Sequence, residues 1–210
     1  MTNRAEIVTS LREARVLPVV TVDDADQAVA TAEALAAGGL PCVEIAFRTP
    51  AAVEALMRVS VIEGVLAGAG TVLSADQARA ARDAGASFAV APGLNEAVVE
   101  ACAELELPFF PGVATPSEIE RARTLDLDVL KVFPVAQLGG PAFLRAVTPT
   151  YPDVSFLPTG GVTQETLAGY LAVPSVLACG GSWMVRPEVL RAARFDEVER
   201  LAREAVGRAA

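Results

Sequence analysis

The sequence predicts an α/β protein folded as a (β/α)8 (TIM) barrel with an additional N-terminal helix. Three observations support this fold class: short apolar segments recur at a nearly constant interval, amphipathic segments separate them, and unusual residues follow many of them. The 210 residues are 52% apolar, so one barrel domain over residues 1–210 is expected. A doubly wound open sheet is the alternative, and it is disfavoured because no GxGxxG motif follows the first strand.

Eight segments have the length and the β-branched or aromatic content of buried strands. They begin near Val16 (VLPVVTV), Cys42 (CVEIAF), Val65 (VLAGAG), Phe88 (FAVAP), Pro108 (PFFPGV), Val129 (VLKVFP), Ser155 (SFLPTG) and Val176 (VLACGG). Their even spacing predicts one parallel ring of strands.

The intervening segments carry apolar residues at three- and four-residue spacing, which is typical of helices. Clear examples are 24–37, 75–84, 95–104 and 117–124, and a further amphipathic segment precedes the first strand. Ser74, Asn95 and Thr115 stand where N-caps are expected, and Gly38 and Gly85 stand where helices should end.

Composition excludes several classes of partner and site. The net charge is -9 without any run of Lys or Arg, so nucleic acid and anionic membrane are poor partners. No signal peptide or transmembrane segment is expected, and the predicted location is the cytoplasm. Cys42, Cys102 and Cys179 lie far apart and are expected to be buried thiols. No histidine and no CxxC pair are present, so no metal site is expected. No cofactor is expected either.

In a barrel of this kind, functional residues lie at the carboxyl ends of the strands and in the loops that follow. We expect the site to draw on residues at the ends of most strands. These are Glu44, Arg48, Thr71, Pro92, Lys131, Phe133, Thr159, Gly160, Gly161, Gly180, Gly181 and Ser182.

Lys131, the only lysine, lies within the apolar strand VLKVFP. The two-residue period places it on the same face as Val129 and Phe133, and if that face lines the barrel, its amine is partly desolvated. Desolvation lowers the pKa of a lysine, and a free amine can attack a carbonyl to form a Schiff base. The alternative is a lysine that extends to the surface.

Glu44 shares a strand face with Cys42, Ala46 and Arg48. A carboxylate among apolar neighbours has a raised pKa and can shuttle protons, whereas the structural alternative is a buried ion pair with an arginine. Arg48 lies about 13 Å along a straight strand from Glu44, so it is expected in the loop, where its guanidinium could bind a carboxylate.

The segments PTGGVT (158–163) and CGGSW (179–183) follow the seventh and eighth strands. These two loops commonly bind phosphate in such barrels, because glycines allow backbone N–H groups to approach an anion. The hydroxyl of Ser182 would add a donor. The sequence therefore predicts phosphate binding without any basic patch.

Seven motifs together resemble the 2-keto-3-deoxy-6-phosphogluconate (KDPG) and 4-hydroxy-2-oxoglutarate (KHG) aldolases, which are class I, lysine-dependent enzymes. They are VEIAFRTP (43–50), GAGTVL (68–73), APGLNE (91–96), FPGVATPSE (110–118), LKVFP (130–134), PTGGV (158–162) and GGSWMV (180–185). The resemblance runs over nearly the whole chain. One departure is Ala46-Phe47, where many relatives have Thr-Leu; we expect it to affect the shape of the pocket and to have little effect on the chemistry.

The resemblance implies Lys131 as the Schiff-base lysine and Glu44 as the general acid-base. Arg48 and Thr71 would bind the pyruvyl carboxylate. Glycines and Ser182 of the last two loops would bind the phosphate, with Thr159 and Phe133 lining the pocket. It also implies a homotrimer, a phosphorylated keto-deoxy sugar acid as substrate and pyruvate as product.

The expected reaction is cleavage of KDPG to pyruvate and glyceraldehyde 3-phosphate, with KHG as a further substrate. Cleavage of the epimer 2-keto-3-deoxy-6-phosphogalactonate is an alternative. A phosphate-binding barrel isomerase or synthase without a covalent lysine is another, and a catalytically silent binding barrel is the third.

Overall fold

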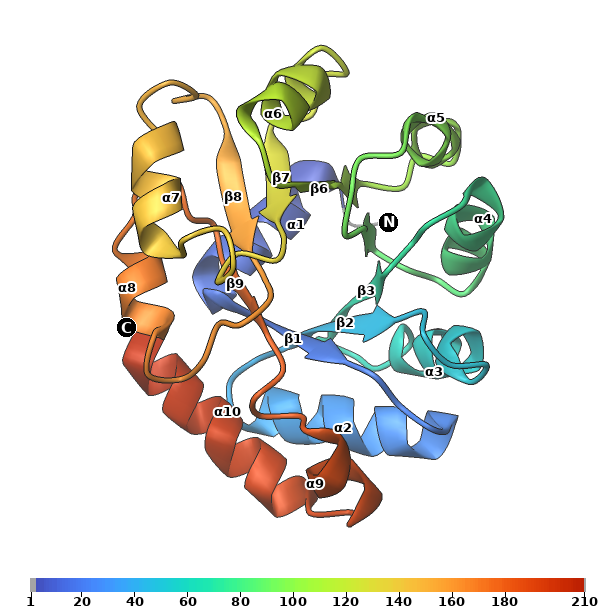
Figure 1. The fold of residues 1–210 in the computed structure, drawn as a ribbon. Helices are drawn as coiled ribbons and strands as arrows, with labels where there is room; N and C mark the ends of the chain where they lie inside the picture. Colours follow the sequence, from blue (N-terminus) through green and yellow to red (C-terminus); the bar gives the residue numbers. More distant parts are fainter. Residues whose placement is uncertain (1–2, 210) are drawn as a thin grey trace.

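The computed structural model describes residues 3–209 as a ring of parallel strands with helices outside it (Figure 1). The strands are β1 (Val16–Val20), β2 (Cys42–Ala46), β3 (Leu66–Gly70), β4 (Phe88–Val90), β5 (Phe109–Phe110), β6 (Gly112–Val113), β7 (Val129–Val132), β8 (Ser155–Pro158) and β9 (Cys179–Gly181). One sheet has the order β5-β4-β3-β2-β1-β9 and another the order β6-β7-β8.

The two sheets join into one barrel. Strands β5 and β6 flank Pro111, which has no N–H to donate, although its carbonyl accepts from the Lys131 N–H. The bridges Phe156↔Val176 and Thr159↔Gly180 link β8 to β9. The predicted eight-stranded barrel is therefore confirmed, with its fifth strand interrupted at a proline.

The helices are α1 (Arg4–Ala14), α2 (Ala25–Ala37), α3 (Ala52–Val59), α4 (Ala75–Asp83), α5 (Glu96–Glu104), α6 (Pro116–Arg123), α7 (Pro141–Val147), α8 (Leu167–Leu171), α9 (Pro187–Arg191) and α10 (Phe195–Ala209). The side chains of Ser74, Asn95 and Thr115 cap α4, α5 and α6 as predicted. Two helices follow the last strand where the alternation predicted one. None of the helices within 3–209 combines the length and apolarity needed to cross a bilayer.

The additional N-terminal helix α1 closes one end of the barrel. Its residues Ile7 and Leu11 are fully buried and belong to the same apolar cluster as Leu17, Phe88 and Phe110 inside the ring. In Figure 1 this helix lies behind the strands, away from the viewer. The cavity described below lies at the opposite end, where the strands finish.

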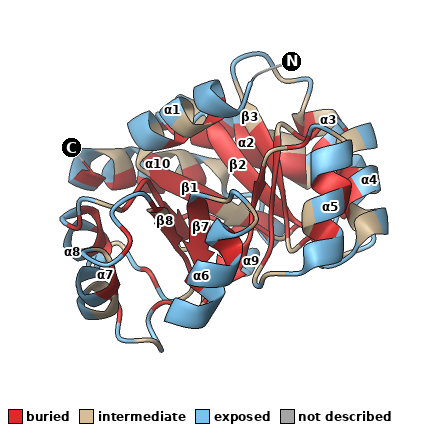
Figure 2. Cartoon of the chain, turned by 90° about the horizontal axis from the view of Figure 1, so that it is seen from above, coloured by how far each residue is buried: buried red, intermediate tan, exposed pale blue. Residues whose placement is uncertain are grey.

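A second apolar layer lies between the ring and the helices, and the strand residues alternate between the two layers. In β7, Val129 belongs to the interior cluster, whereas Leu130 and Val132 belong to the outer one. Figure 2 shows the buried strands in red inside helices whose outer faces are exposed. The alternation places Lys131 inside the barrel.

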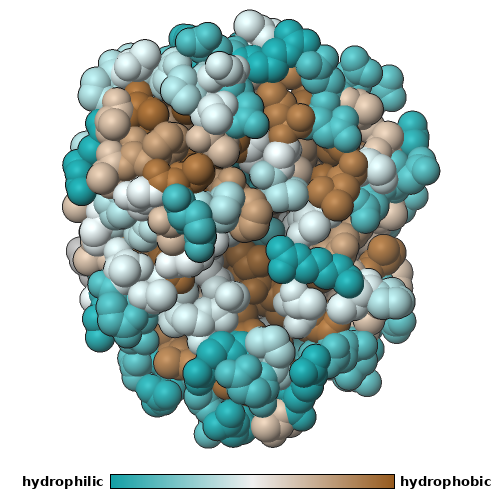
Figure 3. Space-filling view, viewed as in Figure 1, coloured by the Kyte–Doolittle hydropathy of each residue, from teal (hydrophilic) through white to brown (hydrophobic). Residues whose placement is uncertain are grey.

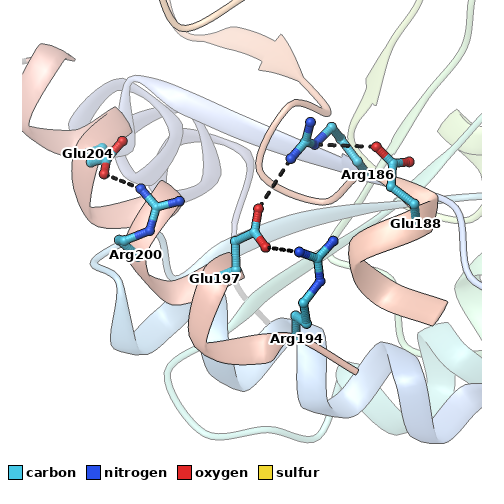
Figure 4. A network of polar contacts seen from close by, with 6 residues as sticks. All are labelled: Arg186, Glu188, Arg194, Glu197, Arg200 and Glu204. Atoms are coloured by element: carbon cyan, nitrogen blue, oxygen red, sulfur yellow. Dashed lines mark hydrogen bonds and ion pairs between the residues drawn. The ribbon is translucent and has the colours of Figure 1, made fainter. Parts of the chain in front are cut away.

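Ion pairs connect the segment after β9 to the C-terminal helix. The Glu197 carboxylate forms ion pairs with Arg186 at 3.2 Å and with Arg194 at 2.8 Å (Figure 4). Arg186 also lies 3.6 Å from Glu188, and Arg200 pairs with Glu204. Because the arginines are about half exposed, each pair contributes little stability, and the Arg186–Glu197 pair joins the N-cap residue of α9 to α10.

Candidate active site

Lys131 on β7 and Glu44 on β2 meet in the interior of the barrel. The distance from Lys131 Nζ to Glu44 Oε1 is 3.1 Å, and the side chains are 6% and 1% exposed. They are separated by 87 positions in the sequence, so the closure of the ring brings them together. Glu44 therefore forms its ion pair with the lysine. From the sequence, the structural alternative for Glu44 was a buried ion pair with an arginine.

Removing two charges from water is costly, and a close opposite charge offsets much of that cost. The amine and the carboxylate therefore stabilise each other in an apolar interior. The Phe133 ring centroid lies 5.9 Å from Lys131 Nζ and adds a further favourable contact with the cation. A paired amine and carboxylate at hydrogen-bonding distance can also exchange a proton.

The neighbouring strand β3 leaves space for this pair. Gly70 lies beside Ala46, and a Cβ atom at Gly70 would overlap the Glu44 carboxylate. Gly68 similarly leaves the space that the Phe88 ring fills. The segment LAGAG therefore has a packing role: its glycines allow a carboxylate and an aromatic ring inside a narrow barrel.

A cavity of about 260 Å³ opens at the carboxyl ends of the strands. Eight of the residues expected from the sequence line it, namely Arg48, Phe133, Thr159, Gly160, Gly161, Gly180, Gly181 and Ser182. Figure 3 shows this end of the molecule with apolar and neutral residues toward its centre and hydrophilic residues concentrated toward its rim. Both polar and apolar groups therefore line the cavity, at the open end of a largely apolar barrel.

The glycines of the two loops occupy positions where a side chain would be strained or would overlap a neighbouring residue. Gly160 and Gly161 have φ angles of +92° and +83°, which L-residues rarely adopt. A Cβ atom at Gly180 would overlap the hydroxyl of Thr159, and one at Gly181 would overlap the Trp183 ring. These glycines allow the loops after β8 and β9 to approach each other and expose backbone to the cavity.

Thr71 and Pro92 follow β3 and β4, as expected, but they are not among the residues that line this cavity. Thr71 is half-buried and has a φ of 59°. That conformation is uncommon for a β-branched residue, and such strain often occurs at functional sites. The cavity also includes residues that we did not predict: Val19, Thr21, Val162, Val185 and Pro187. For Val19 and Thr21, the alternation of the first strand is the signal that could have identified them.

The cysteines lie within the apolar layers, as predicted. All three are buried free thiols. Burial raises the pKa of Cys42 and Cys179 to about 12 and that of Cys102 to about 11. The thiols therefore stay protonated at neutral pH and are poor nucleophiles.

The fold and this site define a class: (β/α)8-barrel proteins with a buried amine-carboxylate pair beneath a glycine-lined opening. Residues 7–201 match the family model described as KDPG and KHG aldolase. The chain therefore belongs to the KDPG and KHG aldolase family, and the resemblance seen in its motifs is confirmed.

Individual relatives agree with this assignment. The chain is 45% identical over 199 residues to the 2-dehydro-3-deoxy-phosphogluconate aldolase of Treponema pallidum, covering 94% of this chain and 95% of that protein. It is 40% identical over 192 residues to the KHG/KDPG aldolase of Escherichia coli, with coverages of 91% and 90%. A crystal structure of the KDPG aldolase of Legionella pneumophila, with pyruvate captured as a covalent carbinolamine, superposes with a TM-score of 0.90 at 34% identity. That superposition covers 93% of this chain and 96% of the other.

Proposed function

We propose that this protein cleaves KDPG to pyruvate and glyceraldehyde 3-phosphate through a Schiff base on Lys131, and that it also cleaves KHG to pyruvate and glyoxylate. The observation that carries the proposal is the sole lysine, buried 3.1 Å from Glu44 in a member of this family. A phosphate-binding barrel without covalent chemistry, or a silent binding barrel, would have no use for that costly pair.

In the proposed reaction the Lys131 amine adds to the C2 ketone, and loss of water forms a protonated imine. A base removes the proton from the C4 hydroxyl, and the electrons of the C3–C4 bond move into the imine. This step releases the aldehyde and leaves an enamine. Protonation at C3 and addition of water then release pyruvate and restore the amine. Glu44, which lies beside the amine, is the proposed proton carrier for these steps.

The remaining site residues would hold the two ends of the substrate. Arg48 lies in the loop after β2 and lines the cavity, so its guanidinium could bind the pyruvyl carboxylate together with Thr71, and Pro92 is a further proposed substrate-binding residue. Backbone around Gly160, Gly161, Gly180 and Gly181 and the hydroxyl of Ser182 would hold the phosphate. Thr159 and Phe133 lie between the two ends.

The proposal is tested by steady-state pyruvate release from three substrates: KDPG, its 6-phosphogalactonate epimer and KHG. We expect the highest kcat/KM for KDPG and measurable turnover of KHG. A preference for the galactonate epimer would replace the proposed substrate with the alternative one. No release of pyruvate from any of the three would reject aldolase function.

Ser182→Ala should reduce kcat/KM for KDPG about tenfold or more. A hydrogen bond to a charged group contributes about 1.5–3 kcal/mol, and this one would act on the phosphate, remote from the breaking bond. The loss should be nearly absent for KHG, which has no phosphate. Ser117→Ala, an exposed serine on α6, is the matched control. Equal losses on both substrates would assign Ser182 a structural role.

We also propose that the chain assembles as a homotrimer. Large apolar side chains are exposed around α3 and the loop after β3: Val53 is 42%, Met57 52% and Leu73 53% exposed. A mostly apolar groove adjoins them, lined in part by Phe47 and Val53. Exposed large apolar side chains and a mostly apolar groove are typical of a subunit contact.

Met57→Asp should shift the mass measured by light scattering from three chains to one, because a carboxylate would be buried in the contact. Glu100→Asp, on the exposed face of α5, serves as a control for changes outside the patch. A wild-type mass of one chain would reject the trimer. If the Met57→Asp protein remained a trimer, the subunit contact would have to lie elsewhere on the surface.

We also propose that the chain folds as a single domain and that the protein is located in the cytoplasm. Val16 of β1 pairs with Cys179 of β9, so segments from both ends of the sequence build the same ring. The free thiols support a reducing compartment.

A further inference from the structure

Thr21 lies at the end of β1, in the wall of the cavity. Residues of β1 alternate: Leu17 belongs to the interior cluster, and Val19 and Thr21 line the cavity above it. The register Val19↔Glu44 and Val20↔Ile45 places Thr21 beside Ala46. Because alanine has no polar group, Thr21 supplies the hydroxyl at this level of the wall.

The Thr21 hydroxyl makes no hydrogen bond with the residues described here. Other threonine hydroxyls do make hydrogen bonds within the protein. Thr31 donates to the Gln27 carbonyl at 2.7 Å, and Thr49 donates to the Val22 carbonyl at 2.8 Å. Thr21 is half-buried, so its hydroxyl is partly withdrawn from water without gaining a protein partner. A hydroxyl in this position is available to a ligand.

The order of the strands indicates which part of the substrate it would meet. Strand β1 lies between β2, which carries Glu44, and β9, which leads to Ser182. The pairing Pro18↔Gly181 places Val19 beside Ser182. Thr21 therefore flanks the path from the buried pair to the glycine loops.

We infer that Thr21 is a specificity-determining residue that hydrogen-bonds the phosphorylated three-carbon half of the substrate, the half that leaves as the aldehyde. This inference rests on the proposed function and extends it to a residue that lies outside the seven family motifs. The Thr21 hydroxyl would hydrogen-bond an alkoxyl, hydroxyl or phosphate oxygen of the substrate. It would take no part in the covalent steps.

The isosteric change Thr21→Val tests the inference, since it removes the hydroxyl and keeps the shape. We expect KM for KDPG to rise about tenfold, with kcat changed by less than about threefold. Exchange of the C3 protons of pyruvate with deuterated water requires only the pyruvyl half and the enamine, so its rate should be unchanged. Thr21→Ser should restore the wild-type KM.

Thr150→Val, on an exposed turn that is not part of the cavity lining, is the control for the loss of a threonine hydroxyl. An unchanged KM for KDPG in Thr21→Val would overturn the inference. A matching loss in the pyruvate exchange rate would also overturn it, because it would show a general effect on the site. Failure of the wild-type protein to exchange pyruvate protons would instead reject the proposed function itself.

Discussion

Lys131→Arg is expected to abolish turnover of KDPG and the covalent adduct that borohydride traps with pyruvate. A guanidinium stays protonated at any pH a protein tolerates, so it cannot act as the nucleophile. It keeps the positive charge beside Glu44, which preserves the buried pair better than a neutral residue would. The loss of activity should therefore come without loss of the fold.

Mass spectrometry of the wild-type protein should locate one adduct on the peptide that contains Lys131, the only lysine. Circular dichroism and thermal unfolding of Lys131→Arg would verify that the barrel forms. Arg145→Lys, on the exposed face of α7, is added to Lys131→Arg to test whether a lysine elsewhere can carry the chemistry. An adduct on the N-terminal amine alone, or turnover by Lys131→Arg, would contradict the Schiff-base assignment.

Glu44→Gln should lower kcat about 10² to 10⁴-fold, the range typical for the loss of a general acid-base. The amide carbonyl can still accept a hydrogen bond from Lys131, so the packing beside Gly70 is retained, but no group remains there to carry the proton. The borohydride adduct with pyruvate should still form, at a reduced rate, because the amine is present.

Single-turnover measurements would separate slow chemistry from weak binding in Glu44→Gln. Glu100→Gln on α5 offers an exposed control of the same chemical change. A raised KM with an unchanged kcat would make Glu44 a structural partner of the lysine. An unfolded Glu44→Gln protein would be recognised by its thermal transition, and Glu44→Asp would then test whether a displaced carboxylate retains part of the rate.

Local sequence patterns determined most of the secondary structure. The caps at Ser74, Asn95 and Thr115 depend on a side chain and a backbone N–H two or three positions away, so spacing alone identifies them. The inward direction of Lys131 also follows locally, because a strand alternates its faces. The interruption of the fifth strand was harder to predict. Pro111 breaks the hydrogen-bond ladder of this strand, although the apolar sequence of the strand is continuous.

Only the tertiary structure decided which groups meet. The Lys131–Glu44 pair requires β2 and β7 to lie across the same narrow ring, a relation that no local pattern contains. The cavity wall at Thr21 likewise depends on the register between β1 and its neighbours. Sequence patterns encode short-range geometry, whereas the distance between side chains on separate strands is set by closure of the whole barrel and by the small residues, such as Gly70, that let its interior groups approach.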